Sequence, residues 1–178
     1  MTTWIILAGL PGTGKSTLAR ALAQRLEGVV LDKDRLREAL FPGLLTDYTR
    51  QQDDLCMRTI YEAATYLTQH GRPDFLFVDG RTFSRREQIE EAVAAAEQAG
   101  AAWRILHAVC ADEVAEARLN APDASNPARN RDVGLYREIK ARFEAIVAPH
   151  LVVDTTNGVE PMVKRVATIL LNPAIEEN

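Results

Sequence analysis

Glycines, a lysine and a serine occur at fixed spacing near the start of the 178-residue chain, in Gly9-Leu10-Pro11-Gly12-Thr13-Gly14-Lys15-Ser16. The segment matches every fixed position of the phosphate-binding loop (P-loop) pattern GxxxxGK[ST], and it stands between an apolar run and a helical pattern, as that motif requires. Glycine lets a backbone wrap closely around phosphates with its amides pointing inward, and a following helix adds its positive dipole end. The segment is therefore predicted to bind the phosphates of a nucleoside triphosphate.

Each side chain of this loop has an expected task. Lys15 supplies a mobile positive charge for the β- and γ-phosphates, and the Ser16 hydroxyl is an expected ligand of Mg²⁺. Thr17 is expected to help at the α-phosphate. The alternative interpretation is a glycine-rich turn with a surface lysine, which the full match disfavours. The predicted nucleotide-binding residues are Gly9, Pro11, Gly12, Thr13, Gly14, Lys15, Ser16 and Thr17.

Short apolar runs alternate with segments of helical periodicity along the whole chain. Alternation of this kind predicts βαβ units and a five-stranded, mostly parallel sheet with helices on both faces, the three-layer α/β P-loop fold. We expect one domain over residues 1–178. Ser84 and Glu87 form a capping-box pattern, which predicts a helix start at 84. Strands are predicted at 4–8, 29–31, 75–78, 103–109 and 151–154, and helices at 18–26, 34–40, 50–70, 84–100, 112–119, 135–148 and 161–171.

Polar residues follow the predicted strands at the points where the strands end. In sheets of this type, ligands bind beyond the carboxyl ends of the strands, so these side chains are expected to share one edge. The residues concerned are Gly9, Asp32, Asp34, Asp79, Arg81 and Asp154.

Three segments together resemble one branch of the P-loop kinases. They are the P-loop itself, Asp34-Arg35-Leu36-Arg37 after the second strand, and Asp79-Gly80-Arg81-Thr82 after the third. The branch includes polynucleotide 5′-kinases, zeta toxins and chloramphenicol phosphotransferase. The resemblance covers nearly the whole chain in element order, and it implies ATP-dependent transfer of the γ-phosphoryl group to a hydroxyl. Members act on different acceptors, so it implies the reaction better than the substrate.

Asp34 and Arg37 match the Asp-x-x-Arg of polynucleotide kinases, which implies a base and a phosphate-binding arginine. The spacing i, i+3 places both on one face of a helix. Asp34 would accept the hydroxyl proton, and Arg37 would offset charge on the transferred group. Asp32 is a rival base, and Asp34 has an alternative role as a helix N-cap; the two roles are not exclusive.

Asp79 ends the third predicted strand, where related kinases carry an acidic residue. The resemblance implies that it orders Mg²⁺ through water or holds Arg37, and the alternative is a solvated Asp-Gly turn. Arg81 departs from the smaller residue common after this glycine. It either binds an acidic acceptor or phosphate, or is solvated. Asp53 and Asp54 are expected on a solvated helix face that borders the acceptor pocket.

The resemblance also implies a lid over the nucleotide, at about residues 120–132. A lid excludes water and brings arginines to the leaving group. Arg129 is expected to bind nucleotide and Arg131 to act in catalysis, and Arg118 fits the lid pattern loosely. The segment 154–158 resembles the adenine-side loop of the branch, with an ordinary polar turn as the alternative.

The net charge of −4 gives no indication of a basic surface that would bind nucleic acid or an anionic membrane. A nucleic-acid partner is therefore not favoured, and no membrane partner is expected. The first residues lack a basic region and a long apolar run, so they predict a strand and no signal peptide. Two distant cysteines suit a reducing compartment, which favours a cytoplasmic location. A monomer or a homodimer is expected.

The leading hypothesis is an ATP- and Mg²⁺-dependent kinase for a hydroxyl of a small-molecule acceptor. One alternative is a polynucleotide 5′-hydroxyl kinase, which the acidic charge and the lack of interleaved aromatic and basic residues disfavour. Another is a nucleotide-binding regulator with slow hydrolysis and no acceptor. Asp34 discriminates between these classes, because a regulator needs no base near the γ-phosphate.

Overall fold

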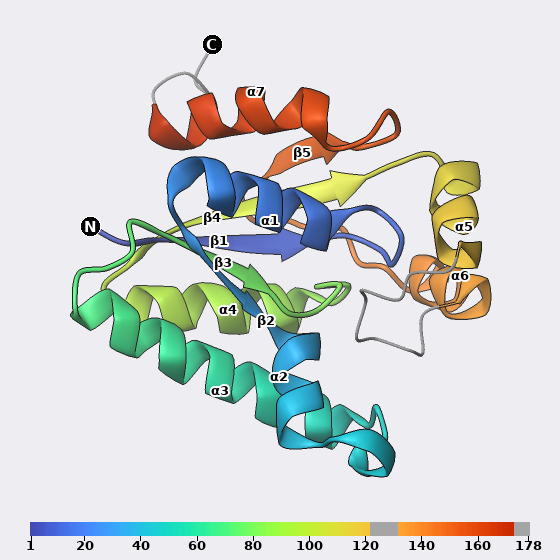
Figure 1. The fold of residues 1–178 in the computed structure, drawn as a ribbon, viewed down its shortest axis with the longest axis horizontal. Coiled ribbons are helices and arrows are strands. Elements are labelled where there is room, and N and C mark those ends of the chain that lie inside the picture. Colours follow the sequence, from blue (N-terminus) through green and yellow to red (C-terminus); the bar gives the residue numbers. More distant parts are fainter. Residues whose placement is uncertain (122–131, 173–178) are drawn as a thin grey trace.

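The computed structural model describes residues 1–121 and 132–172. Within them, five parallel strands form one sheet in the order β2-β3-β1-β4-β5 (Figure 1). The predicted α/β fold is confirmed. The strands are β1 Thr3–Ala8, β2 Val29–Asp32, β3 Phe75–Asp79, β4 Ala102–Val109 and β5 Leu151–Asp154. The helices are α1 Lys15–Leu26, α2 Lys33–Leu40, α3 Arg50–Gln69, α4 Arg86–Gln98, α5 Asp112–Asn120, α6 Val133–Ala141 and α7 Glu160–Leu171, with a 3-10 turn at Gly43–Leu45.

Helices cover both faces of the sheet, which explains why residues 4–8 of the central strand β1 are all apolar. Helices α1 and α7 lie on one face, and α3 and α4 lie on the other (Figure 1). Along β1, Trp4 and Ile6 pack with the α3 and α4 side, while Ile5 and Leu7 pack with α1 and α7. Successive residues of a strand point to opposite faces, so every side chain of a strand that is covered on both faces is buried and tends to be apolar.

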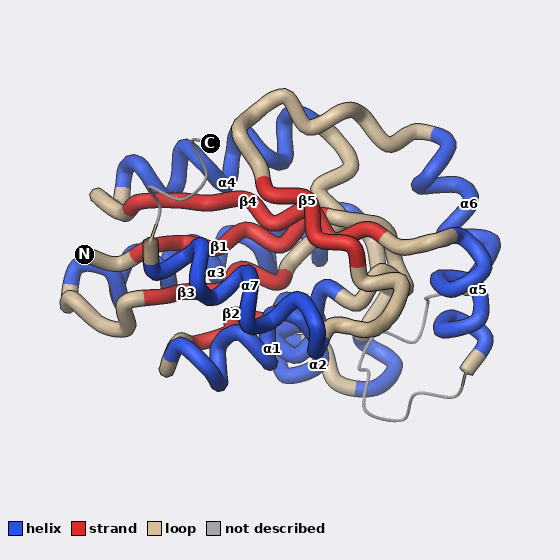
Figure 2. The backbone as a smooth tube through the Cα atoms, turned by 90° about the horizontal axis from the view of Figure 1, so that it is seen from above, coloured by secondary structure: helices blue, strands red, loops and turns tan. Residues whose placement is uncertain are grey.

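The carboxyl ends of the strands meet at one edge of the sheet, and α5 and α6 stand beyond this edge (Figure 2). Asp32 and Asp79 end neighbouring strands and are in register with each other. Asp154 ends β5, the outer strand on the opposite side of the sheet. The strand order therefore gathers the β2 and β3 residues beside the P-loop and keeps Asp154 apart from them.

Helix α4 begins two residues later than its sequence pattern predicts, and the predicted capping box is wrong. The N-cap is Arg85, which makes no side-chain capping bond. Phe83 is 1% exposed and has a φ of 51°, so the chain enters the core before the helix starts. Glu144 supplies the missing cap from a distance, since its carboxylate accepts from the Arg86 amide at 2.7 Å.

Helix α6 ends at Ala141, although an apolar pattern suggested a helix to residue 148. Phe143 stacks on His107 of β4 with 5.5 Å between ring centroids, and Ile146 packs against the α3–α4 core. The amide of Glu144 also donates to the carbonyl of Ser84 at 2.9 Å. The segment after Ala141 thus buries its apolar side chains as an irregular return to the sheet, and tertiary contacts override helix periodicity.

Candidate active site

The P-loop runs from the end of β1 to the start of α1, and its shape requires glycine. A Cβ on Gly9 would lie 2.3 Å from the carbonyl oxygen of Ala108, and Gly9 has a φ of 137°. Gly14 precedes α1 with a φ of 80°. A side chain at Gly9 would clash with the Ala108 carbonyl, and both glycines have positive φ angles that other residues rarely adopt. The loop therefore has the close-packed glycine backbone that a phosphate cradle needs.

The P-loop side chains divide into buried and accessible groups. Lys15 is 8% exposed, and its Nζ donates to the carbonyl of Leu10 at 2.8 Å. The buried Thr13 hydroxyl donates to the same carbonyl at 2.8 Å. Ser16 is half-buried and Thr17 is exposed. The lysine thus lies folded over its own loop, with the helix N-terminus next to it.

Arg118 ties the P-loop to two distant segments. Its Nη1 donates to the Gly12 carbonyl at 3.3 Å and to the Thr155 hydroxyl at 3.2 Å, and its Nη2 donates to the Thr155 carbonyl at 2.7 Å. The fully buried Thr155 hydroxyl in turn donates to the Thr13 carbonyl at 2.8 Å. Helix α5 and the turn after β5 thereby hold the loop in shape. The sequence pattern had linked Arg118 only loosely to a lid.

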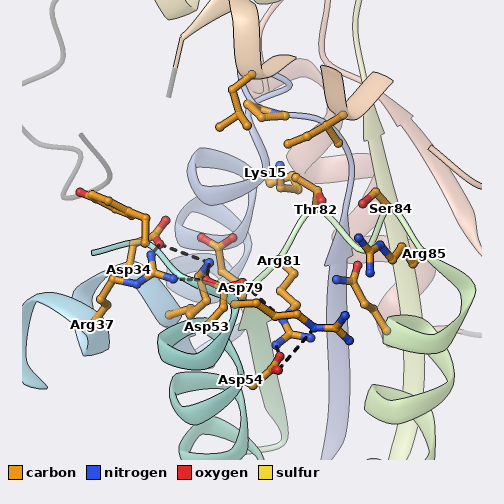
Figure 3. Close-up of a pocket in the computed structure, with 18 of the residues that line it drawn as sticks. Lys15, Asp34, Arg37, Asp53, Asp54, Asp79, Arg81, Thr82, Ser84 and Arg85 are labelled. Atoms are coloured by element: carbon orange, nitrogen blue, oxygen red, sulfur yellow. Dashed lines mark hydrogen bonds and ion pairs between the residues drawn. The ribbon is translucent and has the colours of Figure 1, made fainter. Parts of the chain in front are cut away.

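A pocket of about 320 Å³ opens beside the P-loop. The described residues that line it include Lys15 of the P-loop, Asp34 and Arg37 of α2, and Asp79 of β3. Figure 3 shows Asp34 and Arg37 on one side of the pocket and Ser84 and Arg85 on the opposite side. Residues predicted from three separate segments thus line one cavity.

Asp32 caps α2, and this changes the roles expected at the end of β2. Its carboxylate accepts from the amides of Asp34 at 2.9 Å and Arg35 at 3.2 Å. Asp34 lies inside the first turn, so its alternative role as the N-cap is wrong. Its carboxylate accepts from Arg37 Nη1 at 2.9 Å, with both side chains at least nine-tenths buried. The i, i+3 pairing on one helix face is confirmed.

Asp53 and Asp54 line the pocket, as expected for a helix face that borders it, but both carboxylates are ion-paired. The Asp53 carboxylate accepts from Lys33 Nζ at 2.7 Å and also from Arg37 Nη2. Asp54 pairs with Arg81. The Arg81 side chain is only 7% exposed, so the solvated alternative for this arginine is wrong. Sequence reasoning missed Lys33 entirely, although it directly precedes Asp34 in a buried first helical turn.

Asp79 is 7% exposed and lines the pocket, so it is not the solvated turn of the alternative interpretation. The Ser16 hydroxyl and the Asp79 carboxylate are oxygen donors of the type that Mg²⁺ prefers. Arg129 and Arg131 lie outside the described residues. None of the helices in residues 1–121 and 132–172 has the length and apolar content to cross a membrane.

His107 lies on β4 in contact with the segment after α6. Burial lowers the pKa of its imidazole below the ordinary 6.5, and the charges of His150 and Lys15 lower it further. The His107 ring stacks on Phe143 and lies 5.7 Å from the His150 ring. The neutral form of the His107 imidazole is therefore favoured in the folded protein.

The sequence pattern of a family described as AAA domain matches residues 5–146, which include the P-loop, α2 and β3. The chain belongs to this AAA domain family. The adenylyl-sulfate kinase of Gloeothece citriformis (strain PCC 7424) is 37% identical to this chain over 98 residues. These residues are 52% of the chain and 51% of that relative. The chain thus spans about half the length of the curated relative that it matches.

Several solved structures share the fold of this chain. The APS kinase of Mycobacterium tuberculosis in complex with AMPPNP and APS has a TM-score of 0.71 at 20% identity, covering 96% of this chain and 98% of that one. A candidate kinase from Chloroflexus aurantiacus J-10-fl has a TM-score of 0.70 at 22% identity, covering 96% and 97%. The resemblance to P-loop kinases is confirmed, and this chain is a kinase-like P-loop protein.

Proposed function

We propose that the chain is an ATP-dependent kinase that transfers the γ-phosphoryl group to a hydroxyl of a small-molecule acceptor. The observation that carries this proposal is the shared pocket: Lys15 of the P-loop and the Asp34–Arg37 pair line the same cavity. A nucleotide-binding regulator has no need of a buried carboxylate and arginine at that place. The match to adenylyl-sulfate kinase supports a small acceptor.

In the proposed reaction, the acceptor oxygen attacks the γ-phosphorus while its proton passes to the Asp34 carboxylate. The bond from the γ-phosphorus to the bridging oxygen breaks, and ADP leaves. Phosphoryl transfer needs positioning and charge stabilisation more than strong activation of the nucleophile. Lys15 and Arg37, both buried, would stabilise charge on the phosphates, since cations act more strongly in a water-poor site.

Mg²⁺ would neutralise charge on the bound phosphates, and the Ser16 hydroxyl and Asp79 carboxylate are the residues proposed to hold it. Thr13, Gly14 and Thr17 would contact the phosphates together with the rest of the P-loop. Arg129 and Arg131 remain proposed lid residues, with Arg129 at the nucleotide and Arg131 at the leaving group. We also keep as proposals that residues 1–178 form one domain and act in the cytoplasm.

The test is ADP formation with ATP, Mg²⁺ and a panel of hydroxylated acceptors, measured against a reaction without acceptor. We expect at least one acceptor to raise ADP formation and to gain a phosphate by mass spectrometry. Lys15→Ala should remove this activity and weaken nucleotide binding, because a buried charge on the phosphates is lost. Acceptor-independent ATP hydrolysis that no hydroxyl compound accelerates would favour the regulator. Equal binding and turnover by Lys15→Ala would refute the site.

A further inference from the structure

Cations outnumber carboxylates among the residues that line the pocket. Among the described residues that line it, seven are Lys or Arg and four are Asp, which leaves an excess of three positive charges. The chain as a whole has a net charge of −4. A cavity of opposite sign to its protein concentrates anions, because field lines focus in clefts.

The excess is confined to one part of the lining. Around the transfer site, three cations are balanced by three carboxylates: Lys15, Lys33 and Arg37 against Asp34, Asp53 and Asp79. The remaining charged residues of the lining are four arginines and one aspartate, Asp54. We call these four the arginine group: Arg50, Arg81, Arg85 and Arg142.

The arginine group comes from four separate segments of the chain. Arg50 begins α3, Arg81 follows β3, Arg85 is the N-cap of α4, and Arg142 is the C-cap of α6. Helix periodicity does not produce such a convergence, so it is a property of the fold. Figure 3 shows Arg85 across the pocket from Asp34, where the acceptor hydroxyl would be deprotonated, with Arg81 between them.

The present partners of three of these arginines are weak and replaceable. Arg50 and Arg85 share the exposed carboxylate of Glu87 at 3.4 Å each. Arg50 also lies 3.6 Å from the Asp54 carboxylate. Arg142 pairs at 3.0 Å with Glu138, whose side chain is 61% exposed. Exposed ion pairs of this kind contribute little, because solvent screens them. A ligand anion could therefore replace these partners at little cost.

Arg81 differs from the others because it is buried and fixed. Its guanidinium pairs with Asp54, and it also lies 3.6 Å from the Asp53 carboxylate and 3.7 Å from that of Glu91. These carboxylates hold the guanidinium in place at the pocket wall. Guanidinium groups bind carboxylates and phosphates through two parallel hydrogen bonds.

We propose that the acceptor is an anion: besides the hydroxyl that is phosphorylated, it carries a carboxylate or a phosphate ester, which Arg81, Arg85 and Arg142 bind. This inference rests on the proposed kinase function. It makes the arginine group the specificity-determining part of the pocket, since a neutral analogue would gain no charge-assisted hydrogen bonds from these arginines.

Inorganic phosphate tests the anion site without any transfer. The P-loop is first filled with a non-hydrolysable ATP analogue and Mg²⁺, and phosphate is then titrated by calorimetry. We expect saturable binding that weakens about tenfold or more in Arg85→Ala/Arg142→Ala, as for lost hydrogen bonds between charged groups. The control is Arg104→Ala/Arg137→Ala, which removes the same charge from exposed positions outside this pocket. Absent binding, or equal binding by both double variants, would overturn the inference.

Turnover provides the second arm and separates the two proposals. Acceptors are compared in pairs matched except for the anionic group: glycerol with glycerol 3-phosphate, and glucose with glucuronate. Faster ADP formation with the charged members supports the inference, and the source of the anion follows from which pair responds. Faster turnover of the neutral members overturns it and leaves the kinase intact. If no acceptor responds, the kinase proposal fails, and phosphate binding still decides the anion site.

Discussion

Lys33 of helix α2 donates a hydrogen bond of 2.7 Å to Asp53 of helix α3. The same carboxylate accepts from Arg37, so Asp53 joins two cations that are both nearly buried. Neither contact is a helical i, i+3 or i, i+4 pair, because the partners lie 20 and 16 residues apart in sequence. Asp53 thereby fixes the side chain that positions Asp34.

Asp53→Asn removes the negative charge between Lys33 and Arg37. We expect a loss of about 1–3 kcal/mol in the free energy of unfolding, because two cations lose a charged acceptor. For a chain of this size the melting temperature should fall by about 2–12 °C. Thermal unfolding measures the effect, and Glu62→Gln, on the exposed face of the same helix, is the control. Equal melting temperatures for both variants would show that the pairing contributes nothing.

Arg118→Ala should weaken nucleotide binding without unfolding the protein. The substitution removes three hydrogen bonds to Gly12 and Thr155, so the P-loop loses its tie to α5. A preorganised loop binds more tightly than a mobile one, and we expect the Kd for Mg-ATP to rise about tenfold, as for lost charged hydrogen bonds. Calorimetric titration measures this. Arg118→Lys should not restore affinity, because lysine lacks the planar fork. Full affinity in either variant would contradict the role.

Acid should destabilise the fold through His107. Its folded pKa is lowered by burial and by His150 and Lys15, whereas the unfolded chain titrates near 6.5. The unfolded state therefore binds more protons as the pH falls below about 6.5, and stability declines until the folded pKa is passed. His107→Gln should flatten this part of the curve of melting temperature against pH. The control is His70→Gln, at an exposed helix end. An unchanged slope in His107→Gln would exclude this histidine as the cause.

The P-loop and the fold could be predicted from sequence because their signals are local. Gly9, Gly14, Lys15 and Ser16 are fixed positions between a strand and a helix, and apolar runs reveal buried strands. Asp32 and Asp34 were harder to separate, since both suit a cap or a base. Only the start of α2 at Lys33 places Asp32 outside the helix as its cap.

The rest of the site depends on contacts between distant segments. Charges on α3 are typical of a solvated face, so Asp53 gave no signal of its pairing with Lys33 and Arg37. One signal existed: Asp53 lies in the first turn of a helix that begins beside the pocket. Arg81 likewise acquires a buried role only when β3 brings it to Asp54. The spacing of residues along the sequence does not predict ion pairs between such distant segments.

The most direct test of the account is the transfer rate of Asp34→Asn, followed with an acceptor that the screen identifies. The variant keeps the size of the side chain and removes its charge. General bases contribute roughly 10²–10⁴-fold, so we predict a rate at least about 10²-fold lower with ATP affinity close to that of the unchanged protein. Asp32→Asn is the matched control, because asparagine also caps helices and its rate should stay near normal. Full transfer by Asp34→Asn, or loss of transfer in Asp32→Asn alone, would contradict the assignment of Asp34 as the base.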